Sequence, residues 1–298
     1  MTSGPDILCI GAVLWDIIGR SASHLRQGSD VPGRISRLPG GVAMNIAMAA
    51  GRFGLSPALL TAVGRDAEGD ELIRACESLG MDLRHVYRSD DLPTDRYMAV
   101  EGANGLIAAI ADAHSLEAAG DKILRPLISG PLGSDADPYE GCVALDGNLT
   151  QSLLEFISAS PAFARADLRV APASPGKADR LRPFLTRSRA MLYVNLEEAG
   201  LLCQTTFPDA ATAARAMIAH GAARVSVTDG SRSAAEAVAG GDIVTGCPPE
   251  VLITRVTGAG DTYMAAHIAA ERDGATRQEA LDRALAAAAQ YVSGEIPL

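Results

Sequence analysis

The sequence lacks paired cysteines, and this excludes two kinds of structural framework. Its five cysteines are odd in number, lie far apart and never form a C-x-x-C pair. Neither a disulfide framework nor a zinc site is therefore expected. The histidines show no metal-ligand spacing either. We expect the cysteines to be reduced thiols in the core or at the surface.

Positive charge and long apolar runs are scarce as well. Lys and Arg number 26 against 36 Asp and Glu, a net charge of −10, whereas non-specific nucleic-acid binding needs cations that neutralise phosphates. No apolar run reaches the roughly 18 residues of a membrane span, and the N-terminus lacks the basic start of a signal peptide. We expect a cytoplasmic protein that acts on a small molecule, without a nucleic-acid or membrane partner.

What the chain does contain suits a large globular fold. Hydrophobic residues make up 48% of its 298 residues and charged residues 21%, enough for a sizeable core. Strand-like runs such as Asp6–Val13, Leu59–Val63 and Cys142–Asn148 alternate with helical segments. Because no linker or repeat interrupts this alternation, it predicts one α/β domain over residues 1–298. Helices are expected at Gly69–Leu79, Leu116–Leu127, Lys177–Leu185 and Ala210–His220.

A hairpin breaks the α/β alternation. Arg96–Glu101 and Leu106–Ala111 are strand-like runs on either side of a glycine-bounded turn, which is the pattern of a β-hairpin. A hairpin inserted into an α/β chain suggests an appendage over a site. We expect a small β-sheet lid formed from about residues 12–38 and 94–114, and an exposed edge of this sheet would favour a homodimer through the lid.

The most informative stretch is Thr254–His267. Val251–Val256 is β-branched and apolar, which predicts a buried strand, and the alanine-rich residues after Asp261 predict a helix. Between them, Gly258–Gly260 allow a tight turn whose free N–H groups, beside the positive end of the helix dipole, bind anions such as phosphate. Asp261 either caps this helix or removes a proton from a hydroxyl that attacks the phosphate. The stretch alone leaves both roles open.

Other polar residues follow strands or begin helices. Asp16 follows the first strand, where open α/β sheets bind ligands, and it is either a hydroxyl acceptor or a solvated loop residue. Asn45 lies one helical turn after a glycine pair and is either a ligand contact or a satisfied core amide. Asp112 ends the hairpin and Asn148 ends a strand, so each is either a cleft residue or a turn residue.

Asn195 and Glu198 also allow two interpretations. Asn195 is a good N-cap, and a glutamate three residues later completes a capping box. The same geometry offers an amide and a carboxylate to a hydrated magnesium ion.

Taken together, these motifs resemble the ribokinase (PfkB) family of carbohydrate and nucleoside kinases, from Ile7 to about Val292. The resemblance rests on Gly40–Asn45 and on Val256–Asp261, two signature regions in the family's order. It implies a ribokinase-like three-layer α/β/α fold with a mostly parallel central sheet and a small β-sheet lid. It also implies ATP and Mg²⁺ as cofactors and transfer of the γ-phosphoryl group to a primary hydroxyl of a sugar or nucleoside.

The resemblance implies roles for the matching residues. Those that would bind the acceptor are Asp16, Gly40, Gly41, Asn45, Asp112 and Asn148. Those that would lie along the nucleotide are Asn195, Thr228, Gly230 and Thr257. Glu198 would act on the magnesium ion indirectly, through water. The anion hole would be formed by Gly258, Ala259 and Gly260, with Asp261 as the catalytic base.

Two positions depart from the family pattern, and the acceptor is open. Arg255 stands where the family commonly has an acid, which argues against the monovalent-cation activation of some members, and Ser233 replaces a frequent glycine. Within the family, the stretches Asp146–Leu149 and Ala171–Leu181 are similar to bacterial pseudouridine kinases, which points to pseudouridine as the acceptor. The alternatives are another sugar kinase, ribokinase-like or fructokinase-like, and a non-catalytic sugar or nucleoside sensor. A Rossmann dehydrogenase is weaker, because Gly11 lacks the G-x-G-x-x-G continuation.

Overall fold

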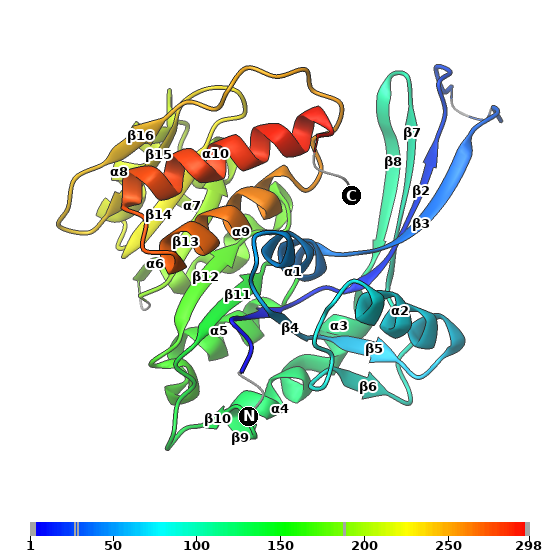
Figure 1. Ribbon diagram of the computed structural model, residues 1–298, viewed down its shortest axis with the longest axis horizontal. Helices are drawn as coiled ribbons and strands as arrows, with labels where there is room; N and C mark the ends of the chain where they lie inside the picture. Colours follow the sequence, from blue (N-terminus) through cyan, green and yellow to red (C-terminus); the bar gives the residue numbers. More distant parts are fainter. Residues whose placement is uncertain (1–3, 27, 29, 187–188, 296–298) are drawn as a thin grey trace.

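An eight-stranded sheet forms the centre of the molecule (Figure 1). The computed structural model describes residues 4–26, 28, 30–186 and 189–295, so residues 27 and 29 of the predicted lid lie outside the described residues. From one edge to the other the strands are β16 (Val244–Gly246), β15 (Ala234–Val238), β14 (Arg224–Thr228), β13 (Met191–Asn195), β12 (Asp167–Ala171), β11 (Cys142–Asp146), β1 (Ile7–Ile10) and β4 (Pro57–Leu60). β4 to β14 pair in parallel, whereas β15 and β16 run antiparallel.

Helices cover both faces of this sheet. Successive strand residues point to opposite faces, so that Leu8 and Ile10 belong to one core cluster while Ile7 and Cys9 belong to the other. One face is covered by α1 (Val42–Arg52), α9 (Ala259–Arg272) and α10 (Arg277–Ser293), and the other by α5 (Gln151–Ala159), α7 (Leu196–Cys203) and α8 (Ala210–Ala219). Because both faces are buried, β1, β4, β11 and β13 are apolar at nearly every position. The three-layer α/β/α architecture is as the sequence predicts.

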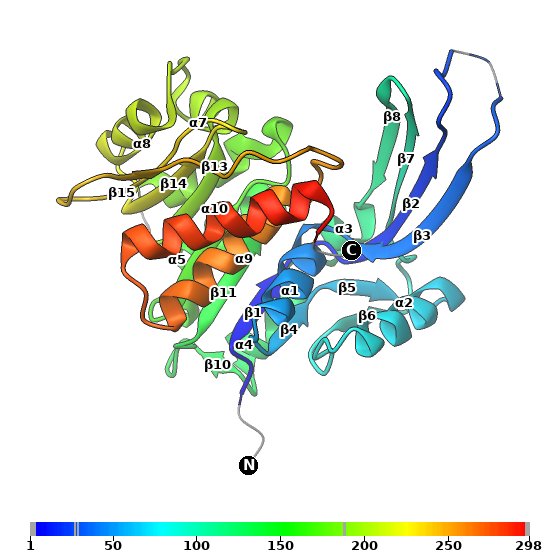
Figure 2. The same cartoon turned by 45° about the horizontal axis from the view of Figure 1, so that its top comes forward.

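A second, smaller sheet projects from this body, as Figure 2 shows. Its strands, in order, are β3 (Arg34–Gly40), β2 (Leu14–Arg20), β7 (Arg96–Gly102) and β8 (Gly105–Asp112). They come from the two segments expected to form the lid. The position predicted for Asp16 is wrong, since this residue lies within β2, opposite Leu38 and Tyr97, and not in a loop after the first strand.

The remaining elements connect these layers. They are β5 (Ala62–Gly64), α2 (Ala67–Ser78), β6 (Tyr87–Ser89), α3 (His114–Ala119), η1 (Gly120–Leu124), α4 (Arg125–Ile128), β9 (Ser129–Gly130), β10 (Gly133–Ser134), η2 (Pro161–Phe163), η3 (Pro175–Leu181) and α6 (Pro183–Thr186). The single helix predicted for Leu116–Leu127 is wrong. Gly120 has φ +57°, which ends α3, and the segment is divided into three short helices.

The buried strand predicted for Val251–Val256 is also wrong. These residues form neither helix nor strand, and Leu252, Ile253 and Val256 are 82%, 60% and 69% exposed. Within the described residues the segment pairs with no strand, and it binds the end of α10 through the N–H groups of Thr254 and Arg255, which both donate to the Val292 carbonyl. Apolar, β-branched residues favour a strand only where a neighbouring strand is available.

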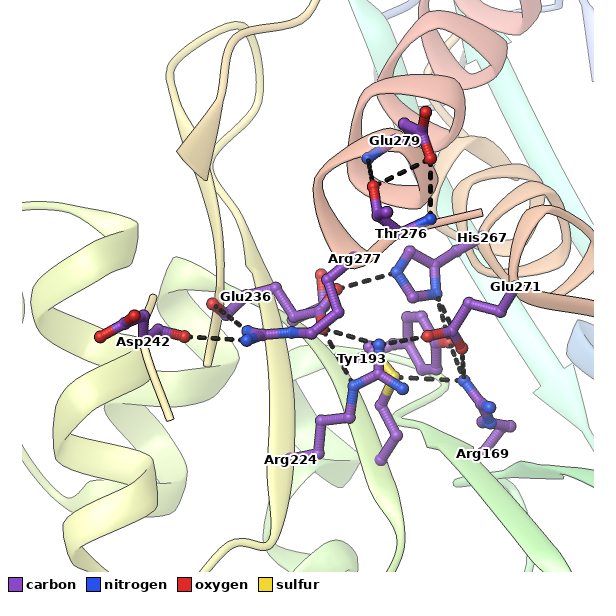
Figure 3. Close-up of polar contacts among 12 residues, drawn as sticks. Arg169, Tyr193, Arg224, Glu236, Asp242, His267, Glu271, Thr276, Arg277 and Glu279 are labelled. Atoms are coloured by element: carbon purple, nitrogen blue, oxygen red, sulfur yellow. Dashed lines mark hydrogen bonds and ion pairs between the residues drawn. The ribbon is translucent and has the colours of Figure 1, made fainter. Parts of the chain in front are cut away.

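A buried charged network fixes the far half of α9 against the sheet (Figure 3). The His267 ring, which is fully buried, lies 2.9 Å from Glu236 Oε2 and 3.0 Å from the Tyr193 hydroxyl. We call this set of side chains the α9 network; its members are Arg169, Tyr193, Arg224, Glu236, His267, Glu271 and Arg277.

None of the helices within the described residues combines the length and apolar character needed to cross a bilayer.

Candidate active site

Two motifs 216 positions apart in the chain meet at a single hydrogen bond. Asn45 Nδ2 donates to Asp261 Oδ2 at 3.0 Å. Asn45 lies in the first turn of α1 and Asp261 in the first turn of α9. The structure therefore brings together the glycine-pair motif and the anion-cradle motif, and it places a carboxylate at the start of one helix beside an amide at the start of the other.

The glycine pair lets Asp16 and the backbone approach α1. A Cβ atom on Gly40 would overlap the Asp16 carboxylate, and one on Gly41 would overlap the Ala12 carbonyl. Gly41 also has φ +94°, in the region that favours glycine. Both positions therefore need glycine, since a larger residue at 40 would displace the Asp16 carboxylate and one at 41 would press on the Ala12 carbonyl.

The surroundings of Asp261 raise its pKa towards neutral pH. Burial raises the pKa of its carboxyl to about 7; the hydrogen bond from Asn45 opposes this rise, and the charges of three further acids, Asp146, Asp16 and Glu198, add to it. Burial likewise raises the pKa of Asp16 to about 6. A general base works best with a pKa near the operating pH, and Asp261 meets this condition.

The turn before Asp261 offers N–H groups to an anion. Gly258 has φ +90° and is the N-cap of α9. The Ala259 N–H donates to the Val256 carbonyl at 3.1 Å. Among the residues that the structure describes, none accepts from the N–H groups of Gly258, Gly260 or Asp261. A Cβ on Gly260 would meet nothing within 4 Å, so the space before the turn is open.

The predicted nucleotide residues lie at the carboxyl edge of the sheet. Asn195 and Thr228 are opposite each other at the ends of β13 and β14, and Gly230 follows two residues later with φ +59°. This is the edge at which open α/β sheets bind ligands.

The predicted capping box at the start of α7 is confirmed. Asn195 Oδ1 accepts from the Glu198 N–H at 2.9 Å, and Glu198 Oε2 accepts from the Asn195 N–H at 2.8 Å. Burial raises the pKa of Glu198 to about 7, the hydrogen bond from the Asn195 N–H opposes the rise, and the charge of Glu197 adds to it. The cap uses one carboxylate oxygen, so the other is left for a water-mediated contact.

Asn148 is held between two side chains. Its Nδ2 donates to Asp146 Oδ2 at 3.1 Å, and Lys177 Nζ donates to its Oδ1. Asp146, which is fully buried, also accepts from the Ala12 N–H at 2.8 Å and thereby joins the end of β11 to the loop after β1. The orientation of the Asn148 amide is fixed before any ligand arrives.

Asp112 stands apart from the other predicted residues. It is half-exposed at the end of β8, and its Oδ1 lies 2.8 Å from His114 Nδ1. No contact within the described residues joins it to Asp261. Its acceptor-binding role remains a prediction.

The sequence analysis did not identify two tyrosines that lie near the candidate site. Tyr97 lies opposite Asp16 in the small sheet, and burial, together with the Asp16 charge, raises the pKa of its phenol. Tyr291 donates its hydroxyl to the Thr257 carbonyl at 2.9 Å, directly behind the anion-binding turn. The one available signal for Tyr291 was a lone aromatic residue in an alanine-rich helix.

Comparison with known proteins identifies the family of this chain. Residues 5–295 match the family described as pfkB family carbohydrate kinase. Pseudouridine kinase from Escherichia coli is 25% identical over 270 residues, which cover 87% of this chain and 81% of that protein. Pseudouridine kinase from Arabidopsis thaliana is 28% identical over 100 residues, 34% of this chain and 26% of that protein.

Solved structures share the fold. A carbohydrate kinase from Agrobacterium tumefaciens superposes with a TM-score of 0.78 at 25% identity and covers 95% of this chain and 89% of its own. Arabidopsis thaliana ribokinase complexed with ribose and ATP gives 0.76 at 19% identity, covering 99% of this chain and 94% of its own. The ribokinase-like fold is thus confirmed. The chain belongs to the pfkB family of carbohydrate kinases, phosphotransferases that use an alcohol group as acceptor.

Proposed function

We propose that the protein transfers the γ-phosphoryl group of ATP to the 5′-hydroxyl of a nucleoside, with pseudouridine as the acceptor. One observation carries the proposal: Asp261, with a pKa raised to about 7, lies directly after a turn whose Gly258 and Gly260 N–H groups lack acceptors among the described residues. The choice of pseudouridine rests on the similarity to two pseudouridine kinases. Acceptor binding is assigned to Asp16, Gly40, Gly41, Asn45, Asp112 and Asn148.

The chain's own residues then account for the transfer. Asp261 accepts the hydroxyl proton while the hydroxyl oxygen forms a bond to the γ-phosphorus, and the bond from that phosphorus to the β-phosphate oxygen breaks to release ADP. The N–H groups of Gly258 and Gly260 stabilise charge on the moving phosphoryl group. Asp16 and Asn45 hold the acceptor's hydroxyls, so that the attacking oxygen faces Asp261.

The nucleotide and the metal ion are assigned to a second group of residues, separate from those assigned to the acceptor. Asn195, Thr228, Gly230 and Thr257 would lie along ATP. Within the described residues, no three metal-ligating side chains converge, which suits Mg²⁺ held by phosphates and water. The oxygen donors fit that ion, since the charges of Asp16 and Glu198 both act unfavourably on the Asp261 carboxylate, and Glu198 would contact the ion through water. When bound, Mg²⁺ neutralises phosphate charge.

The small sheet is the proposed lid and dimer surface. One of its faces presents Ile35, Met98, Val100 and Ile110, which are 80%, 46%, 39% and 62% exposed. Covering this apolar face with a second copy would form a homodimer, and closing the opposite face over the site would exclude water. Free thiols at all five cysteines and the need for ATP support a cytoplasmic location.

A second candidate is a ribokinase-like sugar kinase, which the structural similarity to ribokinase favours. A coupled assay of ADP release with pseudouridine, uridine, adenosine, ribose and fructose 6-phosphate separates the two. We expect the highest kcat/KM with pseudouridine. Turnover confined to free sugars would replace the nucleoside with a sugar, and binding without ADP release would indicate a sensor.

The role of Asp261 is tested by Asp261→Asn, which keeps the size of the side chain but loses the base. We expect kcat to fall by about 10²-fold or more, with ATP affinity by calorimetry nearly unchanged. Glu77→Gln, at an exposed position on α2, is the matched control. Unchanged turnover in Asp261→Asn would overturn the assignment of the base.

A further inference from the structure

The segment that leads into the anion-binding turn is tied to the carboxyl end of α10. The Thr254 N–H and Oγ1 donate to the Val292 carbonyl at 2.8 and 3.0 Å, and the Arg255 N–H donates to the same oxygen at 3.2 Å. Arg255 Nε donates to the Tyr291 carbonyl at 2.7 Å. The last turn of the helix leaves carbonyls without helical partners, and this segment satisfies two of them.

The Tyr291 side chain closes the connection from the other side. The Arg255 guanidinium lies 3.9 Å from the centre of the Tyr291 ring, within cation–π range. The Tyr291 hydroxyl donates to the Thr257 carbonyl at 2.9 Å. A Cβ on Gly258 would lie 2.5 Å from that hydroxyl. Arg255 therefore holds the tyrosine by its carbonyl and its ring, and the tyrosine in turn holds the residues that begin the anion hole.

Two arginines, Arg255 and Arg52, lie near the carboxyl end of α10. The carboxyl end of a helix carries a partial negative charge that favours a cation, and Arg255 supplies one. Arg52 lies near enough for the Arg255 charge to affect its pKa, which burial lowers while the Tyr291 phenol opposes that lowering. The family resemblance implies activation by a monovalent cation for some members, and an acid commonly stands at the position of Arg255 in that family. The residues here do not fit such an ion, because a guanidinium already occupies the Tyr291 carbonyl and would repel it.

We propose that Arg255 and Tyr291 are positioning residues for the phosphoryl transfer, and that the Arg255 guanidinium takes the place of an activating monovalent cation. The pair fixes Thr257 and Gly258, and through them the N–H groups that face the phosphoryl group. The kinase should then need no added K⁺ or Na⁺. The inference rests on the proposed role of Gly258 and Gly260 as the anion hole.

The first test compares salts on the wild-type protein. Initial rates with saturating ATP, Mg²⁺ and acceptor are measured in KCl, NaCl and choline chloride at equal ionic strength. We expect rates that agree within about twofold, because the cation is built into the chain. Activation by K⁺ well beyond that range would overturn the proposal.

The second test replaces the guanidinium. Arg255→Gln should lower kcat about tenfold or more in every salt, since a small misplacement of catalytic groups costs up to about 10²-fold, while KM for the acceptor stays nearly constant. Arg255→Asp should be as slow in choline chloride but recover activity, and gain thermal stability, in KCl. Arg283→Gln, exposed on α10, is the control. Full kcat in Arg255→Gln would overturn the proposal.

If Arg255→Gln does not fold, a milder substitution at Tyr291 still tests the proposal. Tyr291→Phe removes the hydroxyl alone, so the ring contact with Arg255 remains, and we expect a lower kcat with unchanged independence of K⁺. Wild-type kcat in Tyr291→Phe would overturn the positioning role of the tyrosine. An active Asp261→Asn protein, by contrast, would refute the proposed base and leave the salt comparison standing.

Discussion

The two ends of α9 hold acids in opposite electrostatic surroundings. At its start, Asp261 faces other carboxylates, and burial raises its pKa to about 7. Near its end, Glu271 binds Arg169 and Arg224, and its pKa is lowered because these cations outweigh the effect of burial. Burial alone would also raise the pKa of Glu236, but His267 and Arg224 reverse this and lower it to about 2.

The difference separates a reactive acid from a structural one. A buried carboxylate surrounded by cations is locked in its charged form and serves to hold elements together. One whose partners are further carboxylates can gain and lose a proton near neutral pH, which is what a general base must do. The same helix thus carries an anchored end and, under the proposed function, a proton-accepting end, and the anchored end keeps Asp261 in place.

Breaking the anchored end should have the largest effect. Glu236→Ala leaves Arg224, Arg277 and His267 without their shared partner, and removal of one member of a buried ion pair costs about 3–5 kcal/mol. The free energy of unfolding from urea titration at pH 7 measures this, with Glu77→Ala as the exposed control. Because the pKa of Glu236 is lowered, its contribution is present above about pH 4.3, its unfolded value, and is lost as the pH falls towards 2. A loss no larger than that of the control would show that the network is not an anchor.

The proton-accepting end should appear in the pH dependence of catalysis. If the pKa of Asp261 is about 7, kcat/KM should be constant above that pH and fall about tenfold per pH unit below it. Measurements from pH 5 to 9 give the profile. A profile that stays flat down to pH 5 would assign proton transfer to another group.

Much of this site was predictable because its residues follow strands or glycines. Gly40, Gly41 and Gly258 are required by backbone geometry, which local sequence signals directly. The carboxyl ends of β13 and β14 place Asn195 and Thr228 side by side by topology alone. The Asn45–Asp261 bond joins residues 216 positions apart, and neither a local pattern nor the family motifs predicted this contact.

Features that depend on tertiary packing could not be predicted from the sequence. Val251–Val256 has the composition of a strand, yet no strand lies beside it. The place of Asp16 within β2 depends on pairing with β3 and β7, and β2 carries no clear alternation of its own. Tyr291 acquires its role because α10 ends against the turn. Local sequence does not contain these contacts.

Removing the charge of Asp261 should stabilise the protein where that charge is present. Its folded pKa, about 7, exceeds the unfolded value of about 3.9, so wild-type stability falls as the pH rises from about 4 to 7, and the full penalty persists above 7. Asp261→Asn should therefore melt a few degrees higher than wild type at pH 8, since a partly accessible charge is worth about 1 kcal/mol after screening. The gain should vanish near pH 4, and Asp273→Asn, exposed at the end of α9, should show none. A lower Tm at pH 8 would contradict the raised pKa.

The smallest effect should come from the amide that opposes this rise in pKa. Asn45→Ala removes the hydrogen bond that stabilises the charged form of Asp261, worth about 0.5–1.5 kcal/mol, so the acid limb of kcat/KM should move to higher pH by at most about one unit. A shift of that sign would show that Asn45 tunes the base as well as binding the acceptor. A higher KM with an unmoved limb would confine Asn45 to the acceptor, and the carboxylates Asp146, Asp16 and Glu198 would then set the pKa of Asp261 together with its burial.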